Sequence, residues 1–101
     1  MAQVRALFYE KRIRSFAELK REVRHLDSDA GVRIVGYYLK RRCFAFVTRF
    51  VGSYTVMVHE RMGRRAPIAG KRILSREFGS PEDLDEFLQG ITQKGVDAFL
   101  Y

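Results

Sequence analysis

Four runs of β-forming residues, joined by short connections, occupy the middle of the chain and limit the folds that it can adopt. The runs span about residues 32–39, 43–51, 54–61 and 71–78 and are rich in Val, Ile, Phe, Tyr and Thr, which fit a pleated surface. Short connections favour antiparallel pairing of successive strands. The sequence therefore predicts a four-stranded antiparallel meander.

A helix is predicted on each side of these strands. Ser15 and Glu18 have the spacing of a capping box, and apolar residues at helical spacing extend this helix over about residues 16–27. Ser80 and Pro81 form a second helix start, followed by acidic residues and an apolar stripe. We therefore expect an α+β fold in which an N-terminal and a C-terminal helix enclose the meander.

The size and composition of the chain favour one domain of residues 1–101, because 101 residues can form a core without metal or disulfide. Residues 3–14 are compatible with either a helix or a strand. Cys43 is the only cysteine, which fits a reducing, cytoplasmic compartment. No apolar run approaches the roughly 20 residues of a membrane span, so we expect no membrane partner.

Positive charge is concentrated in the predicted strands. From Arg33 to Arg76 the chain has eleven Lys or Arg residues and one acid, Glu60. Aromatic residues at strand spacing are interleaved with this charge. Such a composition is typical of a surface that binds the phosphates of a polyanion and stacks on its bases.

The predicted hairpin around Gly52 and Ser53 separates the side chains of two strands into two faces. A two-residue loop with Gly first pairs Phe46 with His59, and side chains alternate between faces along each strand. The aliphatic face suits packing against helices. The other face is aromatic and partly polar, and it collects Phe44, Phe46, Thr48, Phe50, Thr55, Met57, His59 and Arg61.

A meander places two of its loops at one end of the sheet, and both of these loops are basic. We expect eight positive charges to converge there: Lys40, Arg41, Arg42, Arg61, Arg64, Arg65, Lys71 and Arg72. Their mutual repulsion lowers stability, so a polyanionic partner is a natural explanation. The alternative is that these residues form a solvated rim and that the Phe residues form a core or a dimer interface.

Catalysis and metal binding are not expected. His59 and Glu60 are adjacent on a strand and so point to opposite faces, and the two His residues have no metal-ligand spacing. Acidic residues are almost absent from the predicted sheet, which argues against a nuclease that holds Mg²⁺. We interpret Cys43 as a packed small residue. We therefore expect a protein that is not an enzyme and needs no cofactor.

The order of helix, basic aromatic strands and closing helix resembles the ThermoDBP-related single-stranded DNA-binding proteins of hyperthermophilic archaea. The excess of Arg over Lys, fourteen to five, and the absence of Asn lean towards a heat-adapted source. The resemblance covers most of the chain as architecture and rests on no diagnostic motif. It implies sequence-independent binding of single strands in a basic, aromatic-lined cleft, and a homodimer.

The sequence thus predicts a protein that binds single-stranded nucleic acid, with DNA favoured over RNA. The expected binding residues are Arg41, Arg42, Phe44, Phe46, Phe50, His59, Arg61, Arg64, Arg65, Lys71 and Arg72. The alternative is an RNA-binding or protein-interaction scaffold whose aromatic face is a dimer interface. Exposure of Phe44 and Phe46 discriminates between the two.

Overall fold

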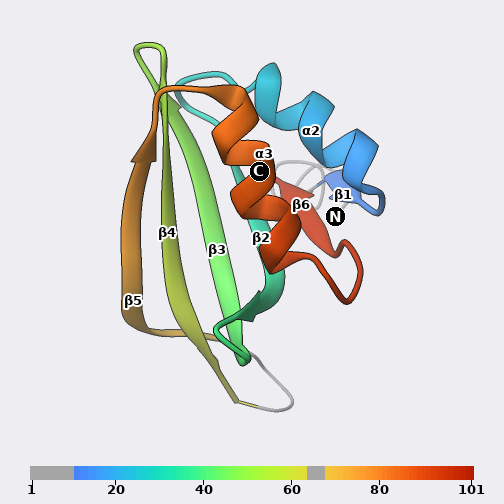
Figure 1. Cartoon of the computed structure of the whole chain (residues 1–101), viewed down its shortest axis with the longest axis vertical. Coiled ribbons are helices and arrows are strands. Elements are labelled where there is room, and N and C mark those ends of the chain that lie inside the picture. The colour runs from blue at the N-terminus through green and yellow to red at the C-terminus, as the bar shows by residue number, and fades with distance from the viewer. Residues whose placement is uncertain (1–10, 64–67) are drawn as a thin grey trace, which may run out of the picture.

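The computed structural model describes residues 11–63 and 68–101 and has an α+β fold with one antiparallel sheet. In chain order the elements are β1 (Lys11–Ile13), α2 (Phe16–Arg24), β2 (Gly31–Tyr38), β3 (Arg41–Phe50), β4 (Ser53–Met62), β5 (Ile68–Phe78), α3 (Pro81–Ile91) and β6 (Ala98–Leu100). The six strands are arranged in the order β1-β6-β2-β3-β4-β5. Both helices lie on the same face of this sheet (Figure 1).

The predicted meander is present as strands β2 to β5. The predicted number of strands was wrong, because two further short strands extend the sheet to six. β6 pairs with β2, and β1 pairs with β6, so chain segments from both ends of the protein complete the sheet beside β2. Gly31 and Tyr101 exchange two backbone hydrogen bonds of 3.1 and 2.9 Å next to this pairing. A strand of three residues has too little sequence pattern to be predicted, since its stability comes from its partners.

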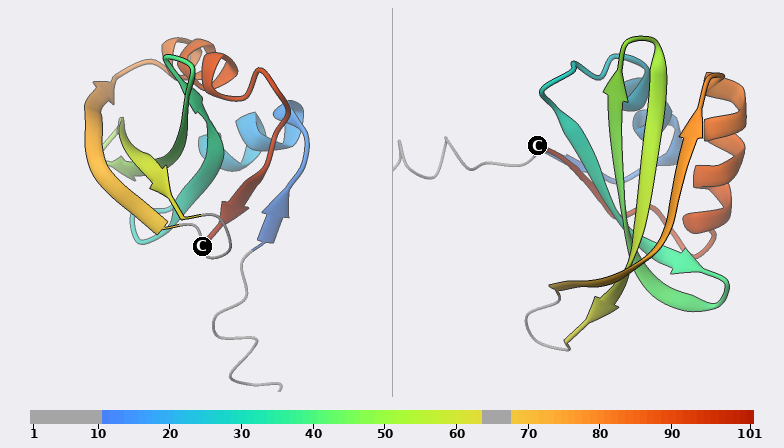
Figure 2. Two further views of the ribbon diagram at one scale, coloured as in Figure 1. Left: turned by 90° about the horizontal axis from the view of Figure 1, so that it is seen from below. Right: turned by 90° about the vertical axis from the view of Figure 1, so that its left-hand side faces the viewer.

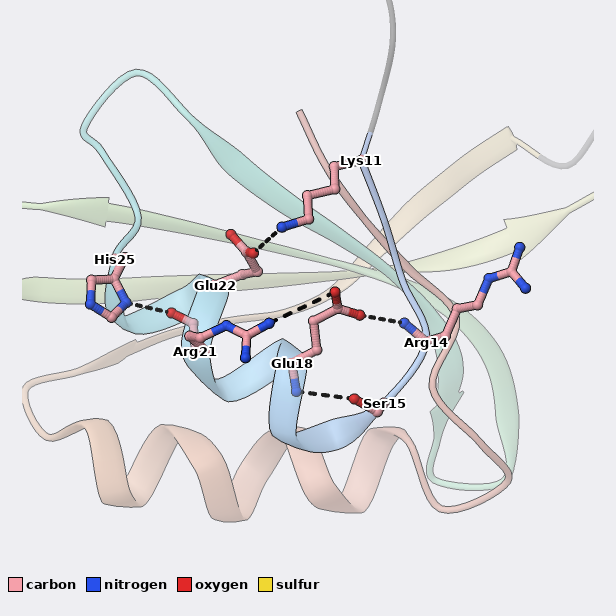
Figure 3. A network of polar contacts seen from close by, with 7 residues as sticks. All are labelled: Lys11, Arg14, Ser15, Glu18, Arg21, Glu22 and His25. Carbon is pink, nitrogen blue, oxygen red and sulfur yellow. Dashed lines mark hydrogen bonds and ion pairs between the residues drawn. The ribbon is translucent and has the colours of Figure 1, made fainter.

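Both predicted helix starts are confirmed. Ser15 Oγ accepts a 3.1 Å hydrogen bond from the backbone N–H of Glu18, whose carboxylate in turn accepts from the backbone N–H of Arg14 (Figure 3). Ser80 caps α3 in the same way and Pro81 lies in its first turn. The first helix is shorter than predicted. It ends at Arg24, with His25 as its C-cap, and not near residue 27.

The predicted register of the β3–β4 hairpin was wrong by two residues. The turn consists of Val51 and Gly52, so Phe50 lies opposite Ser53 and Phe46 lies opposite Met57. Gly52 was predicted at the first turn position, whereas Val51 occupies it. A shift of two residues keeps every side chain on its face of the sheet, so the predicted separation into two faces is confirmed.

The core lies between the sheet and the helices. Ala45, Val47, Val56 and Val58 are completely buried on the helix-covered face of β3 and β4. The apolar stripes of the helices pack over them and include Leu19, Val23, Leu84, Leu88 and Ile91. An ion pair of 2.6 Å between Arg24 and Asp85 joins α2 to α3 on the outside. The helices therefore occupy one face of the sheet and leave the other face to the site.

No helix in residues 11–63 and 68–101 is long and apolar enough to cross a membrane.

Candidate nucleic-acid interface

The sheet face turned away from the helices, which we call the open face, is lined by side chains from neighbouring strands. The register places Arg33, Val35 and Tyr37 of β2 opposite Phe46, Phe44 and Arg42 of β3, and Phe99 of β6 opposite Arg33. On β4 the same face continues with Thr55, Met57 and His59. Antiparallel partners share a face, so the open face brings aromatic and basic side chains of several strands together, with apolar and polar ones between them.

Aromatic rings form the floor of a hollow on the open face. The ring centroids of Phe44 and Phe46 are 6.3 Å apart, and His59 meets Phe46 edge-on at 5.6 Å. The hollow measures about 350 Å³ and is lined by Arg33, Val35, Phe44, Phe46 and Ala69. Small-ligand sites begin at about this size.

The predicted stacking residues differ in how accessible they are. Phe44 is only 8% exposed and so forms the base of the hollow. Phe46 also lines the hollow and is partly exposed. Phe50, at the end of β3, is 72% exposed. The face assigned to these three residues from the sequence is confirmed, and Phe46 and Phe50 expose more of their rings than Phe44 does.

The start of β5 curls across the open face and forms one wall of the hollow. The pairing of β4 with β5 is irregular on both sides of His59, and such irregularities bend a strand and increase its twist. His59 Nδ1 lies 3.0 Å from the carbonyl oxygen of Gly70 and holds the bent segment. Figure 2 shows β5 sweeping under the sheet when the molecule is seen from below. Ala69 thereby reaches the same hollow as Arg33 and Val35 of β2.

Cationic side chains stack on aromatic rings along the opposite side of the open face. The guanidinium groups of Arg33 and Arg12 lie 4.9 and 5.7 Å from the ring centroid of Phe99, within the range of cation–π attraction. The Arg61 guanidinium lies 5.9 Å from the ring of Tyr37. Arg12, Arg33 and Phe99 were not predicted as site residues, although alternation along β2 puts Arg33 on the same face as Tyr37.

The predicted cluster of positive charge is divided between two sides of the sheet end. Arg42 belongs to the open face, and its Nη2 donates to the carbonyl oxygen of Gly63 over 3.4 Å, so the ends of β3 and β4 meet as predicted. Arg41 points to the other side, because consecutive residues of a strand alternate. There it lines a second hollow, of about 450 Å³, together with Glu60, Lys71, Arg72 and Ile73.

Charge in the second hollow is only partly compensated. Glu60 is 4.0 Å from Arg41, while Lys71 and Arg72 are exposed. One carboxylate thus stands among three cations, an arrangement that attracts phosphate. Arg64 and Arg65, which were predicted to join this cluster, lie outside the described residues.

Cys43 is completely buried on the helix-covered face, as predicted for a packed small residue. Burial raises the pKa of its thiol, although the positive charge of Arg61 and a hydrogen bond from Gly36 oppose that rise. A thiol with a raised pKa is a poor nucleophile. The described part of the chain contains no group of three or more His, Cys, Asp or Glu residues that could hold a metal ion.

The chain matches no protein-family model, no curated protein and no solved structure. The resemblance to the ThermoDBP-related proteins therefore stays a prediction.

Proposed function

We propose that the protein binds single-stranded nucleic acid on its open face without strong sequence preference. The observation that carries this proposal is the hollow between Phe46, Arg33 and Ala69, where aromatic surface and positive charge meet on the side of the sheet that the helices leave uncovered. Stacking on a ring suits every base because each base has a π-face. Cations around the hollow neutralise phosphates, which carry no sequence information.

The shape of the site favours single strands over duplex. An unpaired base can leave its stack and enter a hollow of about 350 Å³, whereas the bases of a duplex are held in theirs. Phe44 at the base of the hollow gives such a base an apolar contact, and Phe46 gives it a ring to stack on. DNA is the first strand to test, in line with the resemblance in architecture.

A second candidate function follows from the exposure of Phe50 and Met57, which are 72% and 38% exposed on the open face. Exposed apolar side chains on a sheet face also suit a dimer interface, as in a scaffold module that binds RNA or protein. The mass of the protein without nucleic acid separates the two. If the wild-type protein is a stable dimer and the Phe50→Ser variant is a monomer, the scaffold function is favoured.

We expect single-stranded DNA to compete more strongly than duplex DNA of the same length for the protein, because only the single strand offers free base faces. Fluorescence anisotropy at fixed salt measures this, with RNA of the same sequence as a third competitor. Equal or tighter binding of duplex would remove stacking from the proposal.

Affinity should fall steeply with salt, since each neutralised phosphate releases counterions. Replacing both Lys71 and Arg72 by Ala should flatten the slope of log K against log salt by about 1–2 units if both contact phosphate. The control replaces Lys20 and Arg21 by Ala, which removes the same charge from α2, a helix that lines neither hollow. An equal change of slope in the two variants would assign the effect to net charge alone.

A further inference from the structure

The turn between β3 and β4 has a backbone conformation that its sequence does not favour. Phe50 and Ser53 are the last paired residues, so the turn consists of Val51 and Gly52 alone. Both have positive φ, 43° and 81°, as a type I′ turn requires. Asn-Gly is the favoured sequence for such a turn, because Asn tolerates positive φ much better than a β-branched residue does.

No contact within the described residues explains why Val stands at this position. Val51 is 85% exposed and Phe50 beside it is 72% exposed. The turn therefore combines an unfavourable backbone conformation with two apolar side chains in solvent. Strained backbone of this kind clusters at functional sites, such as those that hold a ligand.

The position of this tip indicates what kind of partner it meets. Phe50 follows Phe44 and Phe46 on the open face, so the tip continues the row of rings to which we assign the bases. Residues 50–54 carry no charge, whereas Lys40, Arg41 and Arg42 stand at the other end of β3. A neutral, apolar tip is unsuited to phosphate but can insert between stacked bases, as apolar wedges do in many DNA-binding proteins.

We propose that Phe50 and Val51 form a wedge that inserts at the junction between single-stranded and duplex nucleic acid. The single strand lies on the open face, and the wedge unstacks the first base pair of the adjoining duplex. The protein therefore prefers a fork to a plain single strand of equal length, and it loosens the junction. This inference rests on the proposed function, because the open face must first hold the single strand.

The test compares the full chain with its variant Val51→Asn. This variant removes the apolar side chain and introduces the favoured turn sequence, Asn-Gly. Wild-type protein should bind a DNA fork about fivefold or more tightly than the same single-stranded arm alone, a factor typical of one stacking contact. It should also raise the fluorescence of 2-aminopurine placed at the junction. Val51→Asn should melt a few degrees higher than wild type and lose both the preference and the fluorescence change.

Two further variants separate the wedge from general effects on the fold. Leu39→Asn acts on the β2–β3 turn, where Leu39 and Lys40 also have positive φ. It should likewise raise the melting temperature but keep the fork preference. Phe50→Ser changes no turn conformation and should lose the fork preference at an unchanged melting temperature.

The wedge is overturned if the wild-type protein shows no preference for the fork. It is also overturned if Val51→Asn and Phe50→Ser keep that preference, or if Leu39→Asn abolishes the preference as they do. A change in the mass of the free protein in the tip variants would also overturn it, because the tip would then be a protein contact. The single-stranded arm alone distinguishes the two proposals. If the wild-type protein binds the arm and shows no preference for the fork, only the wedge fails. If it does not bind the arm, the proposed function fails as well.

Discussion

Replacing Phe46 by Ala should weaken binding of single-stranded oligonucleotides by about 1–3 kcal/mol, the usual loss for one base–aromatic stack, and leave the protein folded. Phe46 is partly exposed on the open face, between the rings of Phe44 and His59. Its removal opens the hollow to solvent and leaves the helix-covered core unchanged. Thermal melts and binding titrations on the same samples measure the two effects separately.

Val47 is the matched control, because it follows Phe46 directly and its side chain is completely buried on the other face. Truncating a buried aliphatic side chain costs transfer free energy and leaves a cavity, so Val47→Ala should lower the free energy of unfolding by about 2 kcal/mol. The affinity of the folded protein should change little. If Phe46→Ala unfolded the protein while Val47→Ala did not, the stacking role of Phe46 would have to be abandoned.

The two faces of the sheet could be predicted from the sequence because they depend only on alternation. Val47, Val56 and Val58 are β-branched residues at every second position, which fixes their shared face whatever the turn. The register depends on the turn, and there Val51 takes a conformation that its side chain disfavours. No rule of turn sequence would have chosen Val over Gly for that position, so the error follows from the same feature that suggests a function for the tip.

The rest of the site depends on contacts between distant segments. Phe99 reaches the open face only because β6 pairs with β2, and a strand of three residues gives no periodic signal. The basic end was predicted as one cluster because its loops share one end of the sheet. Arg41 and Arg42 nevertheless point to opposite sides, and Lys71 and Arg72, next to the irregular pairing around His59, line the same hollow as Arg41. A bulge of this kind is set by packing rather than by local sequence.

Gly36→Ala should destabilise the protein by about 2–3 kcal/mol, the upper part of the usual range for added volume in a packed core. A Cβ on Gly36 would lie 2.5 Å from the side chain of Ile91 and 2.5 Å from its carbonyl oxygen. The carbonyl belongs to the end of α3 and cannot rotate away as a side chain could. For a domain of this size the melting temperature should fall by about 10–20 °C.

Gly90→Ala is the control for Gly36→Ala, since it adds the same methyl group to α3 where nothing lies within 4 Å of the new Cβ. Ala favours helix over Gly by up to about 1 kcal/mol, so this variant should melt slightly higher than wild type. If both variants lowered the melting temperature, the close approach of Ile91 to Gly36 would not be the cause.

The affinity of folded Gly36→Ala reveals how the strain is relieved. Gly36 lies on β2 between Val35 and Tyr37, whose side chains face the open face. If α3 moves outward, only stability falls, because α3 contributes no side chain to the hollow beside Phe46. If β2 moves instead, Val35 is displaced from the hollow and affinity falls as well. Since the sheet is held by hydrogen bonds on both sides of β2, we expect α3 to move and the affinity of the folded protein to stay within about twofold of wild type, a change in binding free energy of less than about 0.5 kcal/mol.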